Sequence, residues 1–201
     1  MPDLFTSPGR WMPLALPDAE IALLRTFSLP NNAFDALLAE SPWRQDNIVI
    51  FGKRMQQPRL HAWYGDPGAT YTYSGLRNEP LPWTESLTVI RRRVAEACGV
   101  GFNAVLLNLY RDQNDSMGMH ADDEPELGSE PAIASLSLGA TRRFVLKHRT
   151  RFDLKTTRID LEDGDLLLMK GATQAHWKHG LPKCSSSCGP RLNLTFRHVR
   201  C

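Results

Sequence analysis

The sequence contains little cysteine and no long uncharged hydrophobic run. Its four cysteines, Cys98, Cys184, Cys188 and Cys201, are too few and too unevenly spaced for the disulfide framework of a small secreted protein. No segment approaches the roughly 18 apolar residues of a membrane-spanning helix, and the first residues lack the basic and apolar stretches of a signal peptide. We therefore expect a soluble intracellular protein with no membrane association, in the cytoplasm of a bacterium or the nucleus of a eukaryote.

The sequence also lacks an excess of either charge. Its 24 basic and 22 acidic residues give a net charge of +2, so any surface that attracts nucleic acid must be local. The chain has 201 residues and no internal repeat, which predicts a single domain, residues 1–201, and we expect a monomer. Cys184 and Cys188 offer half of a zinc site, but no second pair of ligands completes it.

Two segments have the features of helices. The first is Ala33–Glu40, and the second is Glu85–Ala97, where Leu87, Ile90 and Val94 recur at helical spacing. The residues expected at their ends are Asn31 or Asn32 as the cap of the first helix, and Thr84 and Gly99 as the start and end of the second.

From Phe102 onward the pattern changes to short apolar runs with a period of two. The strands expected there are Ala104–Tyr110, Ile133–Leu138, Arg143–His148, Asp165–Met169 and Arg191–His198. This series predicts an antiparallel barrel or sandwich. The interval between the first two strands is too long for a hairpin turn, which favours a functional loop.

That interval contains a pair of residues suited to binding a metal. In an extended segment, His120 and Asp122 point to the same side, so an imidazole and a carboxylate can reach one ion. A third ligand is available from His176 or His179. Two histidines and one carboxylate leave three positions open on a six-coordinate metal, as in non-haem iron(II) oxygenases. A lone His-x-Asp also occurs by chance, and each of these histidines could be an ordinary hydrogen-bonded residue.

The last predicted strand has one polar face. Alternation places Leu192, Leu194 and Phe196 on one side, and the polar side chains on the other. The polar residues are Arg191, Asn193, Thr195 and Arg197. Such a face could simply meet solvent, but two arginines and an asparagine also form a receptor for a small dicarboxylate.

The order His-x-Asp, Trp-x-His-x-x-Pro and Arg-x-Asn-x-Thr-x-Arg resembles the AlkB family of 2-oxoglutarate dioxygenases, over about Ile48 to Val199. Further matching segments are Phe51-Gly52-Lys53, Tyr64-Gly65-Asp66, Tyr71-Thr72-Tyr73-Ser74-Gly75, Asn108-x-Tyr110 and His120-x-Asp122-Asp123-Glu124. These segments are similar to the DNA-repair branch that acts on duplex DNA.

The resemblance implies a β-rich α+β fold with a double-stranded β-helix, or jelly-roll, core and flanking N-terminal helices. It places the catalytic core at about residues 102–199, and a nucleotide-recognition lid and hairpin at about residues 45–80. The cofactors it implies are iron(II), 2-oxoglutarate as co-substrate and molecular oxygen.

The resemblance also assigns roles to the site residues. It implies that the catalytic iron ligands are His120, Asp122 and His179. It implies that 2-oxoglutarate is bound by Asn108, Tyr110, Arg191, Asn193, Thr195 and Arg197. Of the two arginines, we expect Arg191 nearer the C1 carboxylate and Arg197 on the distal C5 carboxylate, with their order left open.

The substrate-binding residues implied are Phe51, Gly52, Lys53, Arg59, Tyr71, Tyr73, Ser74, Asp123 and Glu124. Phe51 and Gly52 would form a hairpin tip inserted into the gap left by a flipped base, with Lys53 and Arg59 near phosphates. Tyr73 would stack on the base against His120. Tyr71 would reach the polar edge or the backbone, and Asp123 and Glu124 would accept from the exocyclic amine. Alternatively, the tyrosines could be ordinary aromatic core residues, and the segment around Phe51 could be an edge strand that ends in a turn.

The function implied is direct reversal of DNA damage. Oxidation of the N-methyl group of N1-methyladenine or N3-methylcytosine, and of small etheno adducts, would release formaldehyde, succinate and carbon dioxide. The expected partner is methylated, double-stranded DNA. The alternatives are the same chemistry on RNA or single-stranded nucleic acid, a catalytically inactive lesion-binding module, and a zinc-stabilised structural domain.

Overall fold

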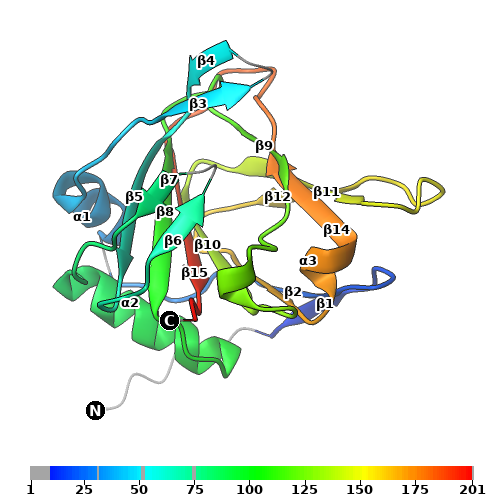
Figure 1. Cartoon of the computed structure of the whole chain (residues 1–201), viewed down its shortest axis with the longest axis horizontal. Coiled ribbons are helices and arrows are strands. Elements are labelled where there is room, and N and C mark those ends of the chain that lie inside the picture. Colours follow the sequence, from blue (N-terminus) through cyan, green and yellow to red (C-terminus); the bar gives the residue numbers. More distant parts are fainter. Residues whose placement is uncertain (1–9, 31, 51–52, 74–75, 201) are drawn as a thin grey trace.

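The computed structural model describes residues 10–30, 32–50, 53–73 and 76–200, and for residues 48–50, 53–54, 71–73 and 76–78 it describes the backbone alone. Two antiparallel sheets face each other (Figure 1). The larger has seven strands in the order β1-β2-β13-β10-β15-β8-β5, and the smaller has the order β12-β11-β14-β9. This arrangement confirms the predicted jelly-roll core.

The strands of the larger sheet are β1 (Met12–Leu14), β2 (Glu20–Leu24), β5 (Leu60–Gly65), β8 (Ala104–Tyr110), β10 (Ile133–Gly139), β13 (Leu166–Lys170) and β15 (Arg191–Arg197). Those of the smaller sheet are β9 (Met117–His120), β11 (Arg142–His148), β12 (Thr157–Leu161) and β14 (Trp177–Leu181). Two further hairpins pair β3 (Asn47–Ile50) with β4 (Lys53–Gln56), and β6 (Tyr71–Tyr73) with β7 (Leu76–Asn78).

The five strands expected after Phe102 are all present, with ends shifted by at most one residue. The sequence pattern missed β1, β2 and β5, which extend the larger sheet from the N-terminal half of the chain. It also missed β9, β12 and β14. β9 and β14 contain glycine and histidine in place of an alternating apolar pattern, so their strand character depends on pairing with neighbours.

Among the described residues, the sheets are accompanied by the α-helices α1 (Ala33–Glu40), α2 (Glu85–Cys98) and the short α3 (Thr173–His176), and by a 3-10 helix, η1 (Pro125–Leu127). The predicted ends of α2 are confirmed, because Oγ1 of Thr84 accepts from the backbone of Leu87 and Gly99 has a φ of 64°. The predicted side-chain cap of α1 is wrong for Asn32, which occupies the cap position without a side-chain hydrogen bond. Asn31 lies outside the described residues.

The alternation of β8 and β15 separates two buried layers. Leu107, Leu194 and Phe196 pack with α1 and α2 in one hydrophobic cluster. Leu106 and Phe144 belong to a second cluster with residues of the smaller sheet. The polar residues of β8 and β15 therefore face the space between the sheets, which positions the site.

The region expected as a lid, about residues 45–80, contains both two-stranded sheets and also β5 of the larger sheet. None of the helices in the described part of the chain has the length and apolarity that crossing a membrane requires.

Candidate metal and co-substrate site

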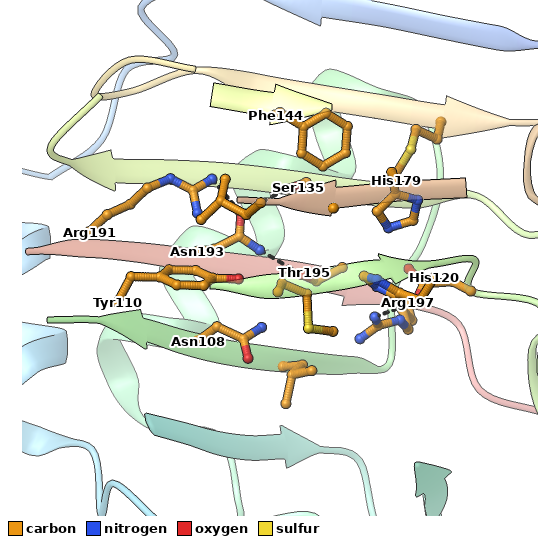
Figure 2. A pocket seen from close by; sticks show the side chains of 16 residues that line it. Asn108, Tyr110, His120, Ser135, Phe144, His179, Arg191, Asn193, Thr195 and Arg197 are labelled. Atoms are coloured by element: carbon orange, nitrogen blue, oxygen red, sulfur yellow. Dashed lines mark hydrogen bonds and ion pairs between the residues drawn. The ribbon is translucent and has the colours of Figure 1, made fainter. Parts of the chain in front are cut away.

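A pocket between the two sheets collects the polar face of β15 and residues from β8, β9, β10, β11, β13 and β14 (Figure 2). His120 and His179 line one part of it, and Arg191 and Tyr110 line the opposite end. Asp122 also lines the pocket and is grouped with the two histidines. All seven residues of β15 are buried, so its polar face meets the pocket and not bulk solvent.

The metal-binding atoms of His120, Asp122 and His179 all lie within 4.8 Å of one another. His120 is the last residue of β9 and pairs directly with His179 of β14. Asp122 follows β9 by two residues. Antiparallel pairing of two short strands therefore brings together ligands that are about 60 residues apart in the sequence.

The hydrogen bonding of His120 leaves its other ring nitrogen ready to bind a metal. Nδ1 lies 2.9 Å from the carbonyl oxygen of Gly118. A carbonyl only accepts, so Nδ1 carries the proton and Nε2 keeps its lone pair. This is the arrangement that orients a metal-binding histidine.

Asp122 is held in its charged form although it is only 1% exposed. Burial raises the pKa of its carboxyl, but the positive charge of Arg197, together with the neighbouring imidazoles of His179 and His120, outweighs burial and lowers the pKa to about 2. Oδ1 accepts from Arg197 at 2.8 Å, whereas the buried Oδ2 has no hydrogen-bond partner. An ionised, buried oxygen without a partner is suited to a cation.

His179 is held in its neutral form. Burial, together with the neighbouring His120 imidazole, lowers the pKa of its imidazole to about 3, although Asp122 acts in the opposite direction. Its ring stacks on Phe144 with 5.3 Å between centroids. Neutral imidazole is the form that binds a metal.

His176 lies elsewhere, in a second group with Asp18 and His148. Nδ1 of His148 accepts from the backbone N–H of Arg151 at 2.9 Å, so the neutral ring carries its proton on Nε2. That nitrogen lies 3.4 Å from Oδ2 of Asp18. A protonated Nε2 is no metal ligand, which makes this group a poor metal site. Between His176 and His179, the structure thus brings only His179 to His120 and Asp122.

The order of the two arginines along the pocket is the reverse of the one expected from the sequence. Arg197 contacts Asp122 at the metal end, whereas Arg191 lies beside Tyr110 at the far end (Figure 2). The reason is the direction of β15, which runs antiparallel to β8 and pairs Arg191 with Tyr110 and Arg197 with Ala104. The alternation of side chains along the strand places both arginines on one face, but it does not tell which of them lies at the metal end of the pocket.

Arg191 is fixed by buried polar groups at the far end of the pocket. Its guanidinium donates to Ser137 Oγ at 2.8 Å and to Asn193 Oδ1 at 2.9 Å. Asn193 in turn donates to Thr195 at 2.7 Å. Burial lowers the pKa of Arg191 to about 10, which still leaves it a cation at neutral pH. Arg191 thus presents a fixed positive charge to the pocket.

Asn108 lines the pocket beside this network, and its Oδ1 accepts from Arg59 Nε at 2.9 Å. Arg59 is only 4% exposed. The guanidinium of Arg59 is thus held against Asn108 and away from the surface, and its expected contact with a DNA phosphate stays a prediction. The partner of Arg59 is 49 residues away in the sequence, which no local pattern indicates.

Asp123 and Glu124 are not among the residues that line the pocket. The carboxylate of Asp123 is about half exposed and pairs with Arg149 at 2.6 Å. Their role in base recognition stays a prediction. Phe51, Gly52 and Ser74 lie outside the described residues, and so do the side chains of Lys53, Tyr71 and Tyr73.

Sequence reasoning missed several residues of the site. Ser135 and Ser137 lie two apart on β10, one donating to Asn193 and the other accepting from Arg191. Their spacing within an apolar strand is a signal that could have found them. Gln174 of α3, whose Oε1 accepts from the backbone of Asp122 at 3.0 Å, carries no such signal.

The donors at the metal end fit iron(II). Two imidazoles and one carboxylate on one side of an ion leave its other positions open, which suits a metal that binds a co-substrate and oxygen. The buried Oδ2 of Asp122 without a hydrogen-bond partner is the observation in this structure that supports the fit.

Comparison with known proteins gives the class of this chain. A family model described as the 2OG-Fe(II) oxygenase superfamily matches residues 24–197. The chain therefore belongs to that superfamily. Iron(II), 2-oxoglutarate and oxygen are accordingly its metal, co-substrate and oxidant, as the resemblance implied.

The similar proteins are of the AlkB family, to which this chain belongs. It is 43% identical over 177 residues to alpha-ketoglutarate-dependent dioxygenase alkB homolog 3 of Bos taurus, covering 84% of this chain and 61% of that protein. It is 44% identical over 158 residues to DNA oxidative demethylase ALKBH2 of Mus musculus, which covers 76% of this chain and 66% of that protein. The chain thus spans less than two thirds of the length of these curated relatives.

A solved structure of OsALKBH1 has the same fold, with a TM-score of 0.64 over 94% of this chain and 100% of that one. Its sequence identity is 18%, so the likeness concerns the fold alone.

Proposed function

We propose that this protein removes methyl groups oxidatively from the bases of damaged DNA. The observation that carries the proposal is the arrangement of a two-histidine, one-carboxylate group and a buried arginine at opposite ends of one pocket. The nucleic-acid substrate is supported by similarity to DNA oxidative demethylase ALKBH2. The substrates proposed are N1-methyladenine, N3-methylcytosine and small etheno adducts, in double-stranded DNA.

The residues of the pocket divide the binding of 2-oxoglutarate between its two ends. Arg191, with Tyr110 and Asn108 beside it, would hold the distal C5 carboxylate by charge-assisted hydrogen bonds. Arg197 would act at the C1 end, because it already contacts Asp122. Asn193 and Thr195 would hold the guanidinium of Arg191 in place.

His120, Asp122 and His179 would hold iron(II), which supplies, with 2-oxoglutarate and oxygen, the oxidising power that hydroxylates the methyl group. The hydroxymethylated base then loses formaldehyde without further catalysis. The protein therefore needs no strong nucleophile or general base near the methyl group. Its own residues bind the co-substrate, orient it and keep the site largely buried.

The test is turnover of a defined lesion. The purified protein, supplied with iron(II) and 2-oxoglutarate, would be mixed with oligonucleotides that carry one N1-methyladenine in duplex DNA, single-stranded DNA or RNA. Succinate formed above the level seen with the unmethylated duplex supports the proposal. If only the RNA oligonucleotide is turned over, RNA and not DNA is the substrate. Binding of the methylated oligonucleotides without succinate formation would favour an inactive lesion-binding module.

A further inference from the structure

Two cysteines contact each other in the segment between β14 and β15. Sγ of Cys188 donates to Sγ of Cys184 over 3.5 Å. Both thiols are free and partly exposed, so a small solute can reach them. The metal and co-substrate site makes no use of either thiol.

The ends of this segment are anchored on both sides of the thiol pair. The backbone N–H of Cys184 donates to Gln113 at 3.0 Å, and the carbonyl of Pro190 accepts from Ala140 at 3.0 Å. The residues between the two cysteines are three serines without regular structure. A disulfide needs its sulfur atoms about 2.05 Å apart, so the two sulfur atoms have to approach each other by about 1.5 Å to form one.

A metal site is the other use for a cysteine pair. A structural zinc site needs four ligands. Among the described residues, neither cysteine belongs to a group of three or more potential metal ligands. The pair is therefore better suited to redox chemistry than to binding a metal.

We propose that Cys184 and Cys188 form a redox modification site, at which a peroxide converts the two thiols into a reversible disulfide within the segment. The thiolate of Cys184 attacks the peroxide and becomes a sulfenic acid, with release of one water. The sulfur of Cys188 then attacks that of Cys184 and displaces the second water. The two thiols lose two electrons and two protons in total, and hydrogen peroxide is reduced to two waters.

The structure also indicates which sulfur reacts first. Cys188 donates its proton toward Cys184, and burial and that hydrogen bond raise the pKa of the Cys188 thiol. Because Cys188 is the donor of this contact, we assign the first attack to Cys184 and the resolving step to Cys188. The thiol of Cys98, whose pKa burial raises to about 12, is a natural control for nonspecific oxidation.

The disulfide would act on the co-substrate end of the pocket, an effect that rests on the proposed function. The segment begins after Leu181 and ends at Arg191, and both residues line the pocket. Arg142 donates to the carbonyl of Pro182 at 2.8 Å and lies over the ring of Tyr110. A cross-link that restrains this segment should raise the KM for 2-oxoglutarate by about threefold or more, as restraint of a loop beside a site commonly changes KM.

The chemical test is peptide mapping of the full-length protein. After brief treatment with hydrogen peroxide, remaining thiols are alkylated and the protein is cut after lysine and arginine. Both cysteines then lie in the single peptide 184–191. We expect this peptide without alkyl groups and lighter by two hydrogens, with reversal by dithiothreitol. The variants Cys184→Ser and Cys188→Ser should lose the product, and Cys98→Ser should keep it. Sulfinic or sulfonic acid at Cys184 of the wild type, without the cross-link, overturns the proposal.

The kinetic test compares the KM for 2-oxoglutarate before and after oxidation, with peroxide removed and fresh iron(II) added. The Cys188→Ser variant should show no such change. A complete disulfide with an unchanged KM would refute the effect on the co-substrate end. If no form of the protein turns over methylated DNA, the proposed function fails, whereas the mapped disulfide stands.

Discussion

The guanidinium of Arg197 donates a 2.8 Å hydrogen bond to Oδ1 of Asp122, and both residues are less than 5% exposed. This contact links the polar face of β15 to the metal end of the pocket. It keeps one carboxylate oxygen, Oδ1, occupied and leaves the buried Oδ2 without a hydrogen-bond partner. Arg197 is therefore expected to act on the metal, and Arg191 on the distal end of the co-substrate.

A matched pair of arginine variants tests this division. Arg191→Ala should raise the KM for 2-oxoglutarate by about ten- to a hundredfold, because a charge-assisted hydrogen bond is worth roughly 1.5 to 3 kcal/mol. Its iron content should be unchanged. Arg197→Ala should lower iron affinity and reduce the free energy of unfolding by about 3–5 kcal/mol, since it leaves a buried charge without its partner. Iron titration, chemical unfolding and steady-state kinetics measure these effects. Loss of iron affinity in the Arg191 variant, with a raised KM for 2-oxoglutarate in the Arg197 variant alone, would refute this order of the two arginines.

A second pair compares two histidines three residues apart. His179→Ala should lose iron and all turnover, because it removes one of the three ligands. His176→Ala should retain both, because His176 lies in the group with Asp18 and His148. The measurement is iron content per chain after loading and desalting. Loss of iron from the His176 variant alone would show that the ligand has been chosen wrongly.

Gln174 is expected to position Asp122 without touching the metal. Its Oε1 accepts from the backbone N–H of Asp122 at 3.0 Å, and its side chain is buried. Gln174→Leu keeps the approximate volume and removes this acceptor, so iron affinity should fall by about ten- to a hundredfold, as for other residues that support metal ligands. Gln174→Glu, which keeps an oxygen at this position, should restore part of the affinity. Unchanged iron binding in the leucine variant would exclude this role.

Phe51 carries the prediction of a preference for duplex DNA. Extruding a paired base costs a few kcal/mol of stacking and pairing, which an inserted apolar side chain partly offsets. Phe51→Ala should therefore reduce repair of a methylated duplex by a much larger factor than repair of the same lesion in a single strand. Met55→Ala, in the adjacent strand β4 and 52% exposed, is the matched control. Equal losses on both substrates would point to a packing role for Phe51.

Much of the core followed from local patterns in the sequence. The apolar alternation of residues 104–110 and 191–197 predicted two strands and a polar face on the second, and the structure pairs these strands with each other. The helix at residues 85–98 was indicated by its spacing and its terminal residues. In each case the signal lies within a few residues, where backbone geometry alone decides which side chains share a face.

The residues that sequence reasoning misplaced depend on contacts between distant segments. The antiparallel direction of β15 relative to β8 sets which arginine lies beside Tyr110 and which at the other end, and no pattern within β15 carries that information. The burial of Arg59 against Asn108 likewise depends on the pairing of β5 with β8. The local sequence also did not distinguish His176 from His179 as the third metal ligand, and only the family resemblance favoured His179.

The most direct measurement of the central claim is the yield of products from one defined lesion. A duplex that carries a single N1-methyladenine would be incubated with the protein, iron(II), 2-oxoglutarate and oxygen, and formaldehyde, succinate and restored adenine would be measured together. The account predicts equal amounts of formaldehyde and adenine, with at least as much succinate, and none of the three with Asp122→Ala. Adenine that stays fully methylated while the protein is loaded with iron and forms succinate at the same rate without DNA would contradict it.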